Sequence, residues 1–202
     1  MTLETPHTVL DYWIGEAAND PEVMATKNRL WFVKSFETDT EIATRFIDTM
    51  AALASGLALK WADEGPQERL AAIITLDQFS RNIFRNMPDA FANDRLALGL
   101  TKEGLLKGDD TKLTEVERWF FYLPLEHSES AVNQDLSIRM YEKLAAEARP
   151  EFSSTMASAL DYARQHKAVI DQFGRYPHRN AILGRPSTPE EQTYIDEPGS
   201  GF

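Results

Sequence analysis

Apolar residues recur three and four positions apart along most of the chain, which is the spacing of one helix face. The clearest example is the series Ile42, Phe46, Met50, Leu53 and Leu57. No stretch keeps the two-residue alternation of a strand for long enough to count. The pattern predicts an all-α protein of about eight or nine helices, joined by short connections and paired antiparallel.

Capping residues and prolines mark the helix starts in the first half of the chain. Thr5-Pro6 fits a cap followed by the first helical position, and Asn19-Asp20-Pro21 interrupts the first helix. Thr38 and Glu41 have the spacing of a capping box, which predicts a helix from there to about residue 61. Gly65-Pro66 predicts a break, followed by a helix over roughly residues 66–86.

The second half carries similar signals. Lys107-Gly108 predicts the end of a helix over about residues 89–107. Thr114 and Glu117 form a second capping box, and Pro124 is expected to kink or stop the helix that they open. Thr188 is expected to cap a short last helix.

We expect residues 1–202 to form a single all-helical domain, because no linker and no low-complexity segment divides them. A regular repeat of about 34 residues, the mark of a tetratricopeptide array, is absent. A tetratricopeptide-like superhelical stack of helical hairpins with degenerate repeats stays open as the arrangement.

Composition narrows the chemistry. The chain has 202 residues, no cysteine, and 21 Lys and Arg against 32 Asp and Glu, which gives a net charge of −11. Without cysteine there are no disulfides, thiolate metal sites or cysteine nucleophiles. The acidic balance argues against nucleic-acid binding. No apolar run approaches the roughly 20 residues of a membrane span, and residues 1–7 lack the features of a signal peptide. We therefore expect a cytoplasmic protein without a membrane partner.

The segment Leu76–Arg85 is richer in functional groups than a surface helix requires. Asp77, Arg81 and Arg85 lie four residues apart and share one helix face. Asp77 also lies near the apolar stripe, which suggests that it is partly buried. The alternative is an ordinary ion pair on a solvated face.

The second candidate segment, Glu117–Glu129, passes from an aromatic cluster through Pro124 to Glu126-His127. A helix break leaves backbone polar groups free to bind a ligand. Alternatively, His127 is a cap or a surface residue. The aromatic side chains themselves are expected to pack in the core.

The third segment, Gly174–Arg185, contains Arg175, Arg179 and Arg185 and no acidic residue, so it is locally +3 in an acidic protein. Arginine favours carboxylate or phosphate recognition, and Asn180 lies in the same segment. In the alternative interpretation, these arginines attach the last loop to acidic helices.

Histidine and carboxylate groups are the remaining candidates for catalysis. His127, His166 and His178 lie in or near these segments, and Glu126 adjoins the first of them. The chain has neither a His-Glu-x-x-His motif nor the paired Glu-x-x-His of di-iron bundles, so acid–base chemistry is favoured over a metal site. Nucleophile-elbow, P-loop and dinucleotide motifs are also absent, and no cofactor is identified.

The segments Leu76–Arg85, Phe120–Glu129 and Phe173–Arg185 together resemble the bacterial DUF924 proteins of unknown function. The resemblance extends over nearly the whole chain, with Ser80 standing where the family usually has proline. It implies an all-helical, tetratricopeptide-like fold. It implies no established activity, cofactor or catalytic residue.

These observations lead to one principal hypothesis: a pocket for a small anionic ligand in which histidine and carboxylate groups transfer protons. The candidate catalytic residues are Glu126, His127, His166 and His178, and the candidate ligand-binding residues are Asp77, Arg81, Arg85, Arg175, Arg179, Asn180 and Arg185. One alternative is an adaptor that binds a peptide or protein in a groove. Another is a buried ion-pair network with a structural role. The aromatic-rich helices are also compatible with a homodimer.

Overall fold

The structure, a computed structural model, describes residues 3–197, and all regular secondary structure in that range is helical. Its α-helical segments are α1 Pro6–Trp13, α2 Pro21–Phe32, α3 Phe36–Ala52, α4 Ala58–Glu64, α5 Pro66–Ile74, α6 Ser80–Ile83, α7 Asp94–Lys107, α8 Glu115–Glu126, α9 Ala131–Glu147, α10 Ser153–Phe173 and α11 Pro189–Asp196. Single π-helical turns, Leu53–Leu57 and Thr75–Phe79, join α3 to α4 and α5 to α6 into continuous helices. With each joined pair counted once, residues 3–197 form nine α-helices. The predicted all-α fold of about eight or nine helices is confirmed.

Most of the predicted helix boundaries are confirmed. Thr5 caps α1, Gly65-Pro66 opens α5, and α7 ends at Gly108 in the left-handed conformation that favours glycine. In the box that opens the last helix, the N–H of Glu191 donates to Thr188 Oγ1 (3.2 Å), and the N–H of Thr188 donates to Glu191 Oε2 (2.8 Å). Local side-chain chemistry therefore determines these starts.

The predicted capping box of Thr38 and Glu41 is wrong. The helix α3 begins at Phe36, and Ser35 is its cap, with Ser35 Oγ accepting a hydrogen bond from the N–H of Thr38. A serine in extended backbone one turn earlier thus starts the helix before the threonine. The expected helix over residues 89–107 also divides, into a 3-10 turn at Pro88–Phe91 and α7.

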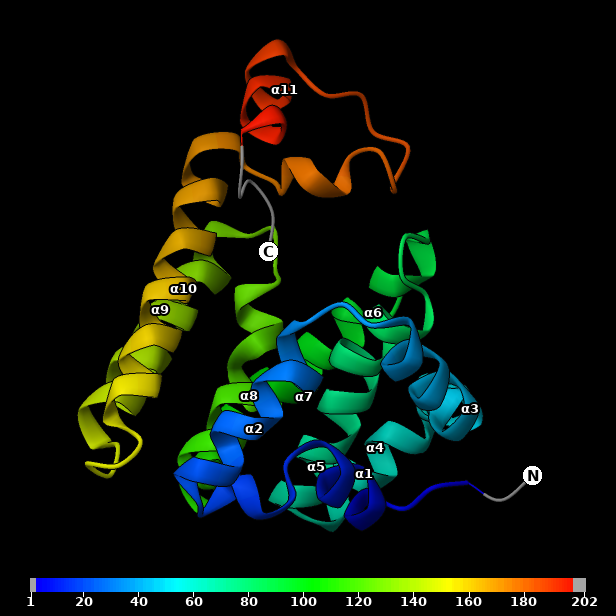
Figure 1. The fold of residues 1–202 in the computed structure, drawn as a ribbon, viewed down its shortest axis with the longest axis vertical. Helices are drawn as coiled ribbons and strands as arrows, with labels where there is room; N and C mark the ends of the chain where they lie inside the picture. Colours follow the sequence, from blue (N-terminus) through cyan, green and yellow to red (C-terminus); the bar gives the residue numbers. More distant parts are fainter. Residues whose placement is uncertain (1–2, 198–202) are drawn as a thin grey trace.

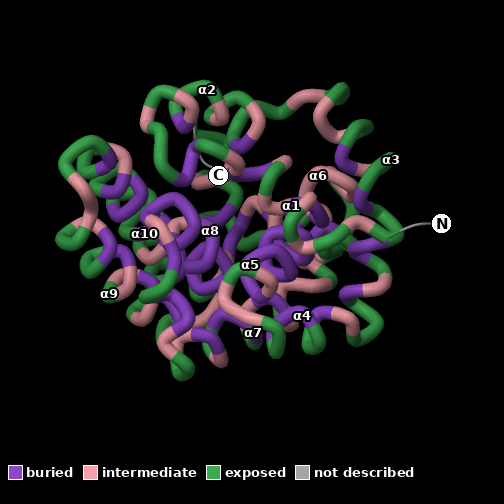
Figure 2. The backbone as a smooth tube through the Cα atoms, turned by 90° about the horizontal axis from the view of Figure 1, so that it is seen from below, coloured by how far each residue is buried: buried purple, intermediate pink, exposed green. Residues whose placement is uncertain are grey.

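The helix α5 runs through the middle of the molecule, and every residue from Arg69 to Ile74 is buried (Figure 2). It packs against α1, α4, α7 and α8. Aromatic rings fill the space around it: Trp13 meets Phe79 at 5.3 Å and Phe120 at 5.8 Å between ring centroids. Phe120 and Phe121 are buried, which confirms that these aromatic side chains belong to the core.

The helices α8, α9 and α10 pack against one another, and α9 and α10 form a long pair along one side of the molecule (Figure 1). Pro124 lies inside the last turn of α8, which ends at Glu126. The helix thus passes through Pro124 and ends two residues later, so the predicted stop at this proline is not seen. The next residue, His127, is placed where the helix has just ended.

One helical stretch, residues 36–64, is long and apolar enough to cross a membrane by length and composition. Its residues Ile42, Phe46 and Leu53 are fully buried in the core. Gly56, with φ of 117°, interrupts its helical geometry. A third of its apolar window is buried, so the stretch packs one face against the core and leaves the rest outside it.

Candidate functional site

The side chain of Asp77 lies in the π-helical turn between α5 and α6 and is only 1% exposed. A π turn adds a residue to a helical turn and so changes which side chains face inward, and such turns are frequent at functional sites. Gln78 donates a hydrogen bond to the Asp77 carboxylate. Asp77 is therefore an internal carboxylate, not part of a solvated helix face.

Asp77 fixes the protonation of His127. The Nδ1 atom of His127 lies 2.8 Å from Oδ1 of Asp77. Burial by itself would raise the pKa of Asp77, but the charge of Arg81, together with the hydrogen bond from His127, outweighs burial and holds the pKa well below its usual range. Since an ionised carboxylate only accepts hydrogen bonds, Nδ1 of His127 carries the proton and Nε2 keeps its lone pair.

His127 is neutral at pH 7 and remains accessible. Burial, followed by the charge of Arg81, lowers its pKa below the ordinary value of 6.5. Its side chain is nevertheless 15% exposed. The pair thus presents a basic imidazole nitrogen, oriented by a carboxylate, at a partly open position.

Two arginines lie beside this pair and share one carboxylate. Arg81 Nη1 is 3.1 Å from Asp77 Oδ1, which confirms the expected i,i+4 pair, and 3.1 Å from Asp94 Oδ1. Arg179 Nη1 donates to Asp94 Oδ2 at 3.4 Å. We refer to Asp77, Arg81, Asp94, His127 and Arg179 as the Asp77 cluster.

Arg179 comes from the 3-10 turn Pro177–Arg179, in the segment after α10 that crosses the molecule toward α6 (Figure 1). Its guanidinium group lies between the rings of Phe91 and Tyr176, 4.6 and 4.7 Å from their centroids. The side chain is 8% exposed, and its Nε atom is buried without a hydrogen-bond partner among residues 3–197. Arg179 therefore has hydrogen-bonding capacity that the described chain does not use.

An inner layer, Glu126 and His166, lies beneath the Asp77 cluster. Burial, then the negative charge of Asp77, raises the pKa of Glu126 to about 8, so its carboxyl group is mainly protonated at pH 7. The Oε1 atom of Glu126 is 3.3 Å from Nδ1 of His166. The same Nδ1 lies 2.9 Å from the carbonyl oxygen of Tyr162, and burial lowers the pKa of His166 to about 3.

Three histidines neighbour one another or are linked through the ring of Tyr176. The centroid of His166 is 6.2 Å from that of His127 and 5.7 Å from that of Tyr176, which is 5.5 Å from His178. Burial, then the charge of Arg179, lowers the pKa of His178 to about 4. All three imidazoles are therefore uncharged at neutral pH, and the arginines are the cationic groups of this site.

Four of the predicted site residues take part in other contacts. Arg85 pairs with Asp39 at 2.5 Å. Arg175 pairs with Glu191 at 2.6 Å, and Arg185 pairs with Glu129 at 2.6 Å. Asn180 hydrogen-bonds to side chains of the same loop and of α11; its partners are Arg185, Ser187 and Glu191. Arg175 and Arg185 thus follow the alternative interpretation in part, because they attach the last loop to α11 and to the segment between α8 and α9. Arg85 instead forms an ordinary ion pair away from that loop.

Asp94, Phe91 and Tyr176 were not among the predicted site residues. Tyr176 lies inside the basic segment and has the apolar character of a core residue. Asp94 and Phe91 follow the helix-breaking Pro88, and no charge pattern in the sequence marks them. Only the fold brings them against the two arginines.

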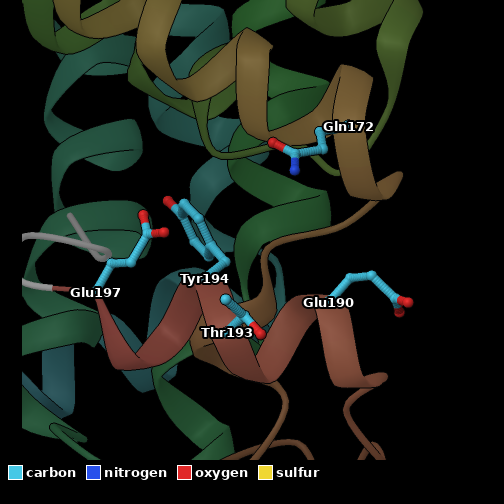
Figure 3. Close-up of a pocket in the computed structure, with 5 residues that line it drawn as sticks. All are labelled: Gln172, Glu190, Thr193, Tyr194 and Glu197. Carbon is cyan, nitrogen blue, oxygen red and sulfur yellow. The ribbon is translucent and has the colours of Figure 1, made fainter.

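Two cavities in the structure lie away from the Asp77 cluster. One, of about 320 Å³, is lined by residues at the end of α10 and in and just after α11, including Gln172 and Tyr194 (Figure 3). The other, of about 410 Å³, is mainly apolar and lies between α7 and α9, with Leu105 and Met140 in its lining. Within residues 3–197, no group of three or more His, Asp or Glu side chains is arranged to hold a metal ion.

In comparison with known proteins, the chain matches a family whose activity is unknown. Residues 9–199 match the family described as "Bacterial protein of unknown function (DUF924)". Among solved structures, the chain is similar to ATU0120, a protein of unknown function from Agrobacterium tumefaciens, with 32% sequence identity and a TM-score of 0.79. That match covers 96% of this chain and 97% of the other. No curated protein matches.

Proposed function

The chain belongs to the DUF924 family of bacterial proteins, whose function is unknown, and we propose that it binds a small organic anion at the Asp77 cluster and transfers a proton to or from it. In this proposal Arg81 and Arg179 bind the anionic group, and His127 is the proton-transferring base. Asp77 holds the imidazole in the tautomer that leaves Nε2 basic.

The observation that carries the proposal is the arrangement around Arg179. Arg81 and Arg179 share the carboxylate of Asp94, Arg81 also pairs with Asp77, and the buried Nε–H of Arg179 has no acceptor among the described residues. A buried donor without a partner costs about 1–3 kcal/mol. An anion between the arginines would supply acceptors for these donors, at a position close to His127.

The proton-transfer step follows from the Asp77–His127 hydrogen bond. When Nε2 of His127 takes a proton from the ligand or from a water molecule, the ring becomes an imidazolium. The ionised Asp77, 2.8 Å away, stabilises that positive charge. When the proton returns, the neutral tautomer is restored, because Asp77 still accepts from Nδ1.

The adaptor hypothesis is less well supported. It requires an apolar groove near the three motifs, whereas the apolar cavity between α7 and α9 is lined by other residues. The net charge of −11 favours a free small molecule in the cytoplasm over nucleic acid or an anionic membrane. A tetratricopeptide-like arrangement and a homodimer stay predictions.

The binding step is tested by thermal unfolding with increasing sodium acetate or sodium phosphate, against sodium chloride at equal ionic strength. A ligand that binds only the folded protein stabilises it by RT ln(1 + [L]/Kd), so the melting temperature rises with its concentration. We expect this rise in the wild type and its loss in Arg179→Gln. Arg85→Gln is the matched control, because Arg85 lies near the same motif and pairs with Asp39 instead. Equal rises in all three proteins would refute anion binding at this cluster.

The catalytic step is tested with the ligand that the protein retains. Mass spectrometry of protein purified under native conditions identifies retained small molecules, and that compound is then incubated with wild type and with His127→Gln. We expect the wild type to convert the compound, whereas the variant binds it without conversion. Equal conversion by both proteins would exclude His127 as the base.

A further inference from the structure

A carboxylate of the protein itself occupies the space between the two arginines. Asp94 Oδ1 lies 3.1 Å from Nη1 of Arg81. The other oxygen, Oδ2, accepts from Nη2 of Arg81 at 3.2 Å and from Nη1 of Arg179 at 3.4 Å. Oδ2 thus accepts from both arginines, while Oδ1 lies within ion-pair distance of Arg81 but is buried without a hydrogen-bond partner among residues 3–197.

We infer that Asp94 is an internal substitute for a ligand carboxylate: it occupies Arg81 and Arg179 in the empty site and gives way when the ligand binds. The inference rests on the proposed function and names its ligand class as a carboxylate. A planar, two-oxygen group already fits between these arginines, and the fork of a guanidinium matches such a group with two parallel hydrogen bonds.

The two acidic residues of the cluster differ in how firmly they are held. Asp77 is 1% exposed and is fixed by Gln78, Arg81 and His127. Among residues 3–197, the side chain of Asp94 has Arg81 and Arg179 as its partners, and it is 23% exposed. Asp94 is therefore the carboxylate that can exchange with a ligand.

Asp94 also has an alternative position close by. It is the first residue of α7, whose preceding residue, Asn93, makes no side-chain capping hydrogen bond. The first N–H groups of a helix lack backbone partners, and a negative charge there is favourable. When a ligand takes the arginines, the Asp94 carboxylate can turn toward these N–H groups, which lowers the cost of its displacement.

This exchange has a measurable effect on affinity. If Asp94 occupies the arginines about 90% of the time, the apparent affinity for a free carboxylate is about tenfold below that of the vacated site. Asp94→Ala should therefore bind acetate about tenfold more tightly than the wild type. Inorganic phosphate should gain less, because its tetrahedral oxygens do not match the planar position.

The test is a titration of wild type, Asp94→Ala and the control Asp39→Ala with acetate and with phosphate, followed by NMR of labelled arginine side chains. Asp39 also pairs with an arginine, but with Arg85 outside the cluster, so its variant should bind as the wild type does. If Asp94→Ala does not fold, Asp94→Asn keeps the side-chain shape without the charge, and the same direction of change is expected.

The outcomes separate this inference from the proposed function. Tighter acetate binding in the Asp94 variant alone supports both. Suppose that acetate binding is lost in Arg179→Gln but is equal or weaker in the Asp94 variant than in the wild type. This result would overturn the inference that Asp94 substitutes for a ligand carboxylate, but it would leave the binding site intact and make Asp94 a positioning residue. A larger gain for phosphate than for acetate would overturn the carboxylate class. No binding by any variant would overturn the proposed function itself.

Discussion

The buried glutamic acid beneath the cluster predicts an unusual pH dependence of stability. Glu126 is 4% exposed, and burial together with the charge of Asp77 raises its pKa from an ordinary 4.5 to about 8. Between these values the unfolded chain releases the proton of Glu126 while the folded protein keeps it. The unfolded state then binds fewer protons, so the contribution of Glu126 to stability falls as the pH rises from about 4.5 to about 8.

The magnitude follows from the shift. Where one state is ionised and the other protonated, stability changes by about 1.4 kcal/mol per pH unit. From pH 5 to pH 7, within the shifted range, the loss is about 2–3 kcal/mol. The substitution Glu126→Gln keeps a neutral side chain of similar shape at every pH and should remove this dependence.

The assay is urea unfolding followed by tryptophan fluorescence at pH 5, 6 and 7, in wild type and Glu126→Gln. His166 and His178 have lowered pKa values, so their contribution to the stability of the folded protein falls as the pH falls. This effect is present in both wild type and variant. From pH 5 to pH 7, the unfolding free energy of the wild type should therefore fall by about 2–3 kcal/mol relative to that of Glu126→Gln. A difference that is constant with pH would refute a protonated Glu126 in the folded protein.

Three further substitutions test the packing and the ion pairs. The Cβ of Gly104→Ala would lie 2.6 Å from a ring carbon of Phe121, so urea unfolding should show a loss of about 1–3 kcal/mol in the free energy of unfolding. The matched variant Gly99→Ala lies in the same helix, and its Cβ would meet nothing within 4 Å, so its free energy of unfolding should rise by about 0.5–1 kcal/mol. Arg185→Gln removes a two-bond ion pair and should cost about 1–2 kcal/mol, with faster amide exchange over residues 174–188; unchanged exchange there would contradict its role in holding the loop. Asp77→Asn removes one of the two carboxylates that pair with the partly buried Arg81 and should cost about 3 kcal/mol. It should also move the imidazole ¹⁵N signals of His127; an unchanged imidazole spectrum would argue against the Asp77–His127 hydrogen bond.

The sequence predicted the helices well where the signal is local. Capping by Thr5 and Thr188 and the Gly65-Pro66 break all depend on residues within one turn of each other. The error at Thr38 has a similar local cause, because Ser35 competes as a cap one turn earlier.

The π-helical turn at Thr75–Phe79 had no such signal. A π turn has one residue more than an α-helical turn, so it changes which side chains share a face after Asp77. The expected stripe of Asp77, Arg81 and Arg85 therefore holds only for its first pair, and Arg85 follows the end of the helix and pairs with Asp39.

The candidate site could likewise be predicted only where its residues carry a local signal in the sequence. Local enrichment in arginine and histidine identified His127 and Arg179, which the fold brings close together across about fifty residues of sequence. Composition could not separate Arg179 from Arg175 and Arg185, because the difference between them lies in their partners. Asp94 carries no sequence signal, and its importance follows only from its distances to two arginines.

The most direct test of the central claim is the ¹H–¹⁵N spectrum of the arginine Nε–H groups and the imidazole nitrogens during titration with acetate. The Arg179 Nε–H signal and the His127 Nε2 signal should move together with one dissociation constant, while the Arg85 signal stays in place. If acetate saturates the protein while the Arg179 and His127 signals do not move, the ligand binds elsewhere and the Asp77 cluster is not its site.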